Sequence, residues 1–381
     1  MPLLSPWAIG DVEFPLPIVQ GGMGAGISQA RLSGAVGREG GLGIVSSVAL
    51  DKLVGRREGR RMRTREATAL EIDRTRAMGG PCGINVMVAL QRDYEDSVLG
   101  ALDGHVDFIF SGAGLPLSLP AICGGHPRKD EVGLVPIISS ARALQIVCKR
   151  WERSGVRPAA VVLEGPLAGG HLGFRTPDEV AQPENALELL LPPVLDVAAE
   201  HGGFPVIVAG GIYTHQDIVD WLARGAAAVQ MGTRFLATEE SEASDEYKSA
   251  VVAAGPDDIT VVHGPGSPCG YPFRILRQSP MWQDFLVQAR PVRCNLGYVM
   301  INGKCAARDD PTSAFCICNG LLAARGCSDD EENPIYTVGA NAWRVDRVMP
   351  VAELMTELAG PRDEKEGASC CSTVSMDSSA M

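Results

Sequence analysis

The residues best suited to proton transfer lie in the segment Glu164–Phe174, where a histidine follows two glycines directly after an apolar run. Imidazole titrates near neutral pH, so His171 could act as a general base or a general acid. Gly169 and Gly170 would let the segment lie flat against a planar ligand, because neither residue carries a Cβ atom. The alternative is a loop histidine that only hydrogen-bonds a neighbouring carbonyl.

Two glycine turns farther along the chain have the form of a phosphate-binding site. The apolar run Pro205–Ala209 ends at the first turn, and the run Ala226–Met231 ends at the second. The residues at these turns that could bind a phosphate are Gly210, Gly211, Gly232 and Thr233. Backbone N–H groups can approach an anion closely at glycine, and the threonine adds a hydroxyl donor. Two ordinary connections between strands and helices, with glycine caps, would have the same appearance.

These candidate residues follow strand-length apolar runs that recur between helix-length segments. Eight such runs are present: Leu16–Gln20, Leu42–Ser47, Cys82–Val88, Val106–Ser111, Leu134–Ser139, Ala159–Glu164, Pro205–Ala209 and Ala226–Met231. Nearly continuous apolar runs are typical of strands buried on both faces, and helical spacers favour parallel connections. We therefore predict an α/β fold, a (β/α)8 TIM barrel, in which sites lie at the carboxyl ends of the strands. An open doubly wound sheet is the competing fold, but no GxGxxG motif follows the first run.

Composition and charge limit the partners. The 381 residues are 45% hydrophobic and only 5% aromatic, which suits a large aliphatic core. A net charge of −12 argues against nucleic acid as a main partner. No apolar run reaches membrane-spanning length and the amino terminus lacks a basic signal-like region, so we expect a cytoplasmic protein without a membrane partner. In that compartment, most of the 11 cysteines would be reduced thiols.

One basic segment stands out against the acidic total. Its arginines are Arg56, Arg57, Arg60, Arg61, Arg63 and Arg65. A solvated helix face or loop is the simpler interpretation of this segment. A site for a phosphorylated co-substrate or an acidic partner is the alternative.

Five motifs occur in the order found in one known enzyme family. They are PIVQGGMG (Pro17–Gly24), GIN (Gly83–Asn85), AGGHLGF around His171, AGGI around Gly210 and QMGTRF around Gly232. The chain resembles the nitronate monooxygenase family, also called 2-nitropropane dioxygenases, over roughly residues 10–240. This resemblance implies an FMN-dependent barrel enzyme. Its small-molecule substrate would be an alkyl nitronate or nitroalkane, oxidised with O2 to a carbonyl compound and nitrite.

The resemblance also implies roles for individual residues. His171 would occupy the position of the catalytic base. The residues expected to bind the flavin are Gly22, Met23, Asn85, Glu164, Gly169, Gly170, Gly210 and Gly211, with Gln230, Met231, Gly232 and Thr233 at its phosphate. Many relatives have a glutamine where this chain has Glu164. A carboxylate there would disfavour anionic reduced flavin unless it is protonated or paired.

Two other functions stay open. The resemblance extends to flavin-dependent enoyl-acyl-carrier-protein reductases and quinone reductases, which use NAD(P)H, although no sequence feature here fixes nicotinamide binding. A non-redox binding module would keep the phosphate turns and use a cysteine-bearing region for metal-dependent interactions. Rapid reduction of bound FMN by NADH or NADPH would favour the first alternative, and absence of bound FMN the second.

The carboxy-terminal third departs from the regular alternation. We predict a barrel over residues 1–239, a cap of helices and loops over 240–360 and a disordered tail over 361–381. The cap contains Cys294, Cys305, Cys316, Cys318 and Cys327. Their spacing lacks a CxxC pair, so reduced thiols are a simpler interpretation than a zinc or iron–sulfur site or a redox disulfide.

Two further segments of the cap could reach the barrel mouth. His263 would do so only if its segment folds back as a lid. The segment Tyr336–Asp346 is expected to dock the C-terminal helix, Val351–Leu358, onto the barrel. The alternative is that Asn341 and Arg344 contact substrate or flavin.

Overall fold

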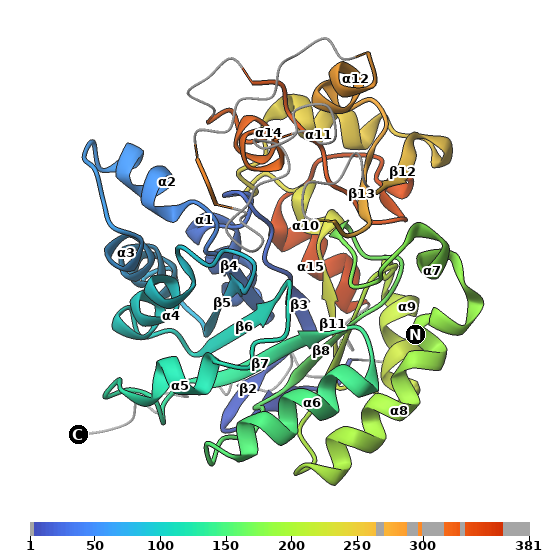
Figure 1. Cartoon of the computed structure of the whole chain (residues 1–381). Helices are drawn as coiled ribbons and strands as arrows, with labels where there is room; N and C mark the ends of the chain where they lie inside the picture. The colour runs from blue at the N-terminus through green and yellow to red at the C-terminus, as the bar shows by residue number, and fades with distance from the viewer. Residues whose placement is uncertain (1–3, 264–269, 288–295, 299–315, 328–331, 361–381) are drawn as a thin grey trace, which may run out of the picture.

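Eight parallel strands form a closed barrel in the computed structural model, which describes residues 4–263, 270–287, 296–298, 316–327 and 332–360 (Figure 1). In chain order these strands are β3 (Ile18–Gln20), β4 (Leu42–Ser46), β5 (Cys82–Met87), β6 (Phe108–Gly112), β7 (Gly133–Ile138), β8 (Val161–Glu164), β10 (Val206–Ala209) and β11 (Ala228–Met231). The barrel closes where β11 pairs with β3. Each of the eight predicted runs overlaps one of these strands, with β6 and β7 each extending one residue beyond its run, so the predicted (β/α)8 barrel is confirmed.

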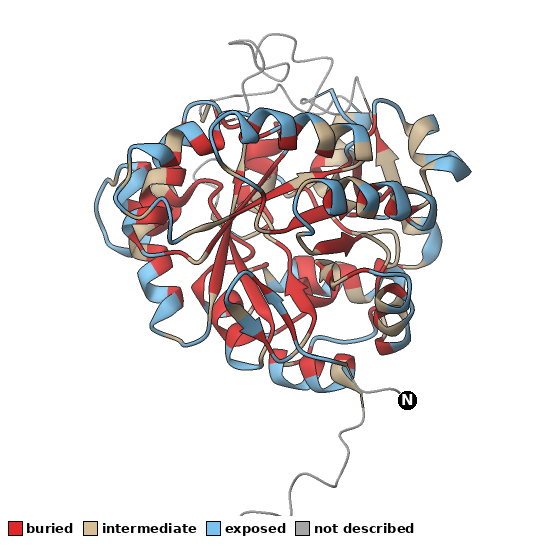
Figure 2. Cartoon of the chain, turned by 90° about the horizontal axis from the view of Figure 1, so that it is seen from below, coloured by how far each residue is buried: buried red, intermediate tan, exposed pale blue. Residues whose placement is uncertain are grey.

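The strands are apolar because both of their faces are covered. β3, β4, β6 and β10 are buried at every residue, as Figure 2 shows from the opposite direction to the cap. Burial on both faces is the normal condition of parallel strands that are wrapped by helices. This explains why continuous apolar runs, rather than alternating ones, marked the strands in the sequence.

Helices surround the barrel and connect its strands. They are α1 (Ala30–Arg38), α2 (Leu50–Arg57), α3 (Thr64–Arg76), α4 (Tyr94–Asp103), α5 (Leu119–Gly124), α6 (Ala141–Glu152), α7 (Pro177–Ala181), η1 (Pro183–Asn185), α8 (Leu187–Glu200), α9 (His215–Ala223) and α10 (Thr233–Leu236). Thr214 begins α9 with a capping box, in which its hydroxyl accepts from Asp217 N. Within the described ranges, every helix is too short or too polar to cross a bilayer.

The last helix, α15 (Val351–Ala359), returns to the barrel wall and packs between α1 and α9. His215 at the start of α9 is hydrogen-bonded through Nδ1 to Leu358 O at 2.9 Å. The buried residues of α15, among them Leu354 and Leu358, join the apolar core between the strands and the outer helices. The predicted C-terminal helix is therefore present and docked on the barrel.

A hairpin closes the amino-terminal end of the barrel. It consists of β1 (Trp7–Ile9) and β2 (Val12–Phe14), which pair antiparallel. Trp7 and Phe14 stack with ring centroids 5.1 Å apart, and Phe14 lies 6.0 Å from the ring of Phe108. These buried rings fill the barrel interior from below together with residues such as Phe110.

The cap lies over the opposite end, where the strands have their carboxyl termini (Figure 1). Its described elements are α11 (Asp245–Val252), η2 (Pro256–Asp258), β12 (Ile259–Val262), β13 (Phe273–Leu276), α12 (Pro280–Leu286), α14 (Ile317–Ala323) and η3 (Ala342–Arg344). β12, β13 and the two-residue strand β9 (Gly170–His171) form one antiparallel sheet. The structure thus adds strands to the helices and loops predicted for this segment, and one of them pairs with the histidine loop of the barrel.

Candidate active site

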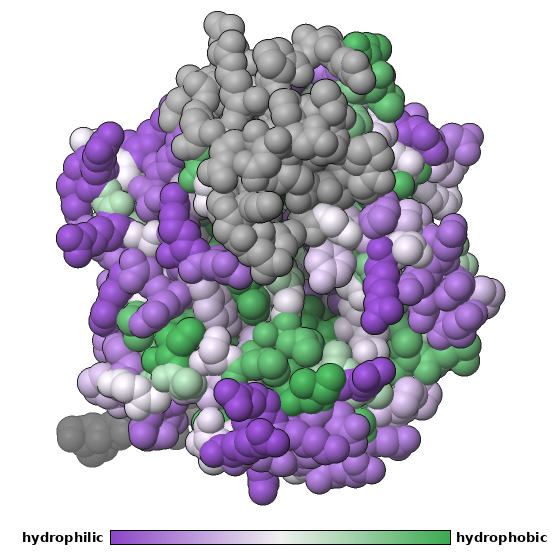
Figure 3. All heavy atoms as spheres, viewed as in Figure 1, coloured by the Kyte–Doolittle hydropathy of each residue, from purple (hydrophilic) through white to green (hydrophobic). Residues whose placement is uncertain are grey.

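A cavity of about 720 Å³ opens at the carboxyl ends of the barrel strands, beneath the cap. The loops after the barrel strands line it, together with cap residues that include Phe273, Tyr298 and Cys318. Figure 3 shows apolar residues gathered on this side of the molecule below the grey atoms, and Leu115 is both exposed and part of the cavity wall. All twelve residues expected to bind flavin, and His171, line this one cavity.

The two glycine turns lie side by side because β10 and β11 are neighbours in the barrel. Gly210 and Gly211 have φ of +104° and +82°, a conformation that favours glycine. At the second turn, the Thr233 hydroxyl accepts a hydrogen bond from Gly339 N at 2.9 Å. Asn341 donates through Nδ2 to Gly211 O at 2.5 Å. The segment predicted to dock therefore braces both turns from the cap side.

Gln230 lies between the turns and the first strand. A Cβ atom on Gly21 would sit 3.2 Å from the Gln230 side chain, so this glutamine packs on the backbone there. Its Oε1 atom is buried and has no hydrogen-bond partner among the described residues. A buried amide oxygen in that state is costly, and a ligand that donates a hydrogen bond in the cavity would satisfy it.

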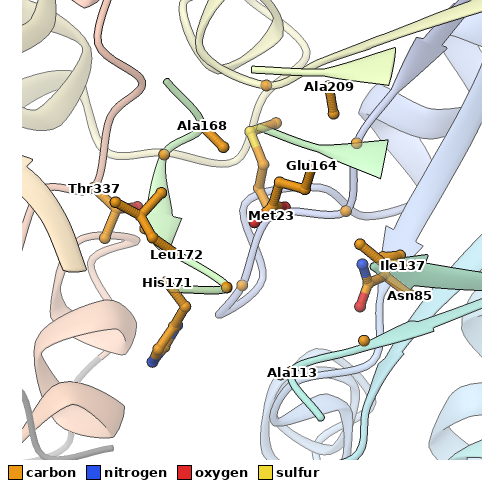
Figure 4. A pocket seen from close by; sticks show the side chains of 18 of the residues that line it. Met23, Asn85, Ala113, Ile137, Glu164, Ala168, His171, Leu172, Ala209 and Thr337 are labelled. Atoms are coloured by element: carbon orange, nitrogen blue, oxygen red, sulfur yellow. The ribbon is translucent and has the colours of Figure 1, made fainter. Parts of the chain in front are cut away.

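The adjacent part of the wall, after β3, is formed by backbone that approaches β5 closely. A Cβ atom on Gly22 would be only 2.4 Å from Asn85 Cβ, so this position requires glycine. Met23 follows, and its N–H donates to Ser28 Oγ at 2.8 Å. Figure 4 shows Met23, Asn85 and Glu164 around the same space. The result is a wall with little side chain between backbone and cavity, as a flat ligand requires.

His171 is held in place by the cap. β13 pairs with β9 so that Phe273 lies opposite His171, and Leu172 N donates to Pro272 O at 2.9 Å. The Phe273 ring meets the imidazole edge-on with centroids 4.7 Å apart. His171 is half-buried and lines the cavity, on a different part of the wall from Glu164 (Figure 4).

Glu164 is the last residue of β8 and faces the cavity. Burial raises the pKa of its carboxyl from 4.5 to about 7, and the charges of His171 and Arg274 oppose this rise. A carboxyl in this condition can exist in either protonation state at neutral pH.

Arg274 is a residue that sequence reasoning missed. It lies on β13, is buried, and donates through Nη1 to Ala168 O in the loop before His171. Burial lowers the pKa of its guanidinium to about 10, and the nearby Glu164 charge opposes that change. The available signal was one arginine inside the apolar run Phe273–Leu276, which is unusual unless the charge has a nearby partner.

The basic segment lies away from the cavity on α2, α3 and their connection. Arg57 bonds Glu71 Oε2 at 2.5 Å, and Arg60 bonds Glu66 at the same distance. Arg65 makes two bonds to Asp103. The Arg60 and Arg65 pairs are exposed and fit a solvated surface, whereas Arg57 reaches the buried Glu71, and the segment contributes nothing to the cavity wall.

The remaining cap predictions have mixed outcomes. Cys294 and Cys305 lie outside the described residues, and no group of potential metal ligands occurs in the parts that the structure describes. The interpretation of the five cysteines as reduced thiols therefore stays a prediction.

The other two cap segments have different positions. His263 follows β12 and does not line the cavity. Arg344 lies over the Tyr213 ring, 4.3 Å from its centroid, and does not line the cavity, whereas Asn341 does line it, so ligand contact stays a prediction for Asn341.

Comparison with known proteins identifies the relatives of this site. The family model described as nitronate monooxygenase matches residues 7–360. A Mycobacterium tuberculosis protein, (3aS,4S,5R,7aS)-5-hydroxy-7a-methyl-1-oxo-octahydro-1H-indene-4-carboxyl-CoA dehydrogenase, is 32% identical over 264 residues, 68% of this chain and 63% of that protein. A probable nitronate monooxygenase of Staphylococcus aureus is 26% identical over 66% of this chain and 72% of that protein.

Solved structures give the same picture of the fold. FabK from Thermotoga maritima matches with a TM-score of 0.64 at 25% identity, covering 90% of this chain and 91% of that one. Nitroalkane oxidase from Streptomyces ansochromogenes matches with a TM-score of 0.64 at 24% identity, covering 91% of this chain and 95% of that one. Matches of this extent include the cap as well as the barrel.

Proposed function

The chain belongs to the nitronate monooxygenase family of oxidoreductases, and we propose that it uses FMN to oxidise alkyl nitronates or nitroalkanes with O2. The observation that carries this proposal is the convergence on one cavity of His171 and the twelve residues expected to bind flavin. They come from five barrel strands and the loops that follow them, β3, β5, β8, β10 and β11, which are distant in the sequence. The carbonyl compound and nitrite would be the products.

The residues present fit FMN. The glycine turns at Gly211 and Gly232 could receive its phosphate, next to the Thr233 hydroxyl. The Gln230 Oε1 atom, which has no hydrogen-bond partner among the described residues, would gain a donor, and Gly22 and Asn85 would lie along the ring because both line the cavity. FMN, when bound, supplies the electron-accepting chemistry of the reaction.

The chain's own contribution is binding, orientation and proton transfer. His171 would take the acidic α-proton of a nitroalkane, since its imidazole lines the cavity and its loop is fixed by β13. A nitronate arrives without that proton and needs no base. The cap would exclude bulk water from the space above the flavin site through side chains such as Phe273 and Tyr298.

A second candidate is an NAD(P)H-linked oxidoreductase that acts on a coenzyme A or acyl-carrier thioester. Two observations favour it. The relative at 32% identity is named as a carboxyl-CoA dehydrogenase. The cavity of about 720 Å³ also has apolar walls, with Leu90, Leu115, Ile317 and Leu321 among them, which would suit the acyl part of a thioester.

Anaerobic stopped-flow absorbance of the FMN-loaded protein separates the two candidates. The protein is mixed in turn with propyl-2-nitronate, NADH and NADPH, and the flavin band is followed. Bleaching by the nitronate alone supports the monooxygenase. Bleaching by either nicotinamide, with no response to the nitronate, overturns it in favour of the second candidate. A protein that retains no FMN overturns both.

A further inference from the structure

Glu164 is an acidic group in a site whose other features suit a negatively charged ligand. Among the described residues that line the cavity, it is the only acidic side chain. No hydrogen bond or ion pair to its carboxyl is formed by any residue within those ranges. The preceding residues of β8, Val161 to Leu163, are fully buried and apolar, so the strand presents this carboxyl only at its end.

The cap supplies a cation for this carboxyl. Arg274 lies on β13 opposite Gly170, and its guanidinium reaches the carbonyl of Ala168 between Glu164 and His171 in sequence. The side chain is only 5% exposed, and it does not line the cavity. A buried guanidinium without a carboxylate nearby would be very unfavourable. The charge of Arg274 acts on the Glu164 carboxyl, while the carboxyl itself lines the cavity and Arg274 does not.

Few other charges face this carboxyl. His171 on β9 is the second titratable neighbour. Arg234 on α10 lines the cavity, but its guanidinium bonds Glu357 at 3.0 Å and lies over the Tyr213 ring. From β7 and β10, the strands paired with β8, the nearest residues are the neutral Ile138, Ser139 and Ala209. The charge state of Glu164 is thus set first by its burial, then by the charges of His171 and Arg274, and by the ligand in the cavity.

We propose that Glu164 takes up a proton when the bound flavin is reduced, and that Arg274 is the positioning residue that keeps the ionised form of Glu164 accessible before reduction. This inference rests on the proposed FMN-dependent function and applies to either candidate substrate. Oxidised flavin that gains two electrons and one proton acquires one negative charge. The Glu164 carboxylate then binds one proton from solvent, so the net charge of the site does not change. The electrons come from the nitronate or from a nicotinamide.

The ionisation equilibrium of the Glu164 carboxyl supports this proposal. The pKa of this carboxyl is about 7. A new negative charge in the same cavity would raise that pKa further. Above that pH the oxidised protein would hold Glu164 ionised and the reduced protein would hold it neutral. The uptake of the extra proton is therefore expected at neutral and mildly alkaline pH, and not in acid.

The test is the midpoint potential of FMN in the full-length protein, measured from pH 5.5 to 8.5 with a reference dye. FMN retention is read first from the flavin absorbance, and its loss would count against the proposed function. With the reduced flavin held as its anion over this range, the slope in the wild-type protein should change from about one proton per two electrons in acid to about two above neutral pH. Glu164→Gln should remove the steeper part and stay near one throughout.

Two further variants test Arg274 and His171 in the same measurement. Arg274→Met removes the cation, so the change of slope should move to higher pH, and Arg274→Lys should restore it toward the wild-type position. His171→Gln should retain the change, because the proton goes to the carboxyl. Infrared difference spectra between pH 6 and 8 give an independent reading, with a carboxylic-acid band that is lost in Glu164→Gln. Bound FMN with the same slope in wild type and Glu164→Gln would overturn the inference and leave the proposed function standing.

Discussion

The two ends of the barrel are built on the same eight strands but are packed in opposite ways. At the amino end, the β1–β2 hairpin inserts Trp7 and Phe14, and these rings meet Phe108 in an interior that is apolar and buried. At the carboxyl end, glycines such as Gly22 and Gly211 replace large side chains, and a cavity of about 720 Å³ is left under the cap.

The change from close packing to an open cavity can be seen within the single strand β8. In β8, three buried apolar residues are followed by Glu164, which faces the cavity. Close packing at the amino end gives stability, since each buried ring contributes transfer free energy and fills volume. The carboxyl end lacks this close packing. It contains the cavity, the Gln230 Oε1 atom without a hydrogen-bond partner among the described residues, and the Glu164 carboxyl with its raised pKa. Substitutions at the two ends should therefore separate activity from stability.

The largest effect is expected from His171→Ala at the carboxyl end. Loss of a positioned general base should lower kcat/KM for a nitroalkane by roughly 10²–10⁴-fold, because proton removal is then left to water. Turnover of the preformed nitronate should change little. Steady-state nitrite release with 2-nitropropane and with its nitronate measures both. His201→Ala, a change outside the cavity, is the matched control. Equal loss with both substrates would contradict the assignment of a base.

The next largest effect is expected at the amino end, where Phe14→Ala should lower the free energy of unfolding by about 3–5 kcal/mol. The ring is 1% exposed and packs on two other aromatic residues, so its removal leaves a cavity that neighbours cannot fill. Leu115→Ala at the cavity mouth, where the side chain is 36% exposed, should cost less than about 1 kcal/mol. Urea unfolding followed by circular dichroism measures both. Similar losses would remove the contrast between the two ends.

Much of the barrel could be predicted from the sequence because its signals are local. Strands buried on both faces appear as short apolar runs, and the turns that end β10 and β11 appear as glycines. His171 was recognised for the same reason, since its flanking glycines and the preceding strand are contiguous in the chain. Together with the motif resemblance, these signals predicted twelve cofactor residues, and all of them line one cavity.

The features that the sequence did not predict depend on contacts between distant segments. β9 exists only because β13, about 100 residues later, pairs with it, and the Arg274 side chain reaches Ala168 through this pairing. The hairpin that closes the amino end is likewise defined by packing on Phe108, which no periodicity reveals. The charge state of Glu164 follows from burial and from Arg274, so it could not be read from the residue type.

A smaller effect is expected from Glu164→Gln in the protein without FMN, and it depends on pH. The folded pKa of about 7 lies above the ordinary 4.5, so between these values the folded state binds more protons than the unfolded state. Stability due to this group is therefore present in acid and is lost as pH rises toward 7. Glutamine avoids the loss. The variant should be more stable than wild type by roughly 2 kcal/mol at pH 8 and nearly equal to it at pH 4.5.

Urea midpoints at the two pH values measure this difference. A stabilised variant at pH 8 would sharpen the comparison between the two ends. It would show that the ionised Glu164 carboxyl lowers the free energy of unfolding at the carboxyl end, whereas the buried rings at the amino end raise it. Glu71→Gln is a useful comparison, because this fully buried carboxyl bonds Ala30 N and Arg57. That substitution should destabilise the protein at pH 8. Destabilisation by both substitutions would show that Glu164 is a structural carboxylate of the same kind.

The smallest effect is expected from Asn341→Ala, which removes the brace between the cap and the first phosphate turn. Its Nδ2 donates to Gly211 O at 2.5 Å, and one such hydrogen bond contributes about 1 kcal/mol. The turn would remain, since Gly210 and Gly211 adopt their positive φ without the asparagine, but it would be less well ordered. FMN should bind roughly fivefold more weakly, as measured by fluorescence titration of the apoprotein. An unchanged affinity would mean that the barrel alone orders the turn and that the cap acts only on the histidine loop, through β13. A loss far beyond fivefold would instead place Asn341 in contact with the cofactor.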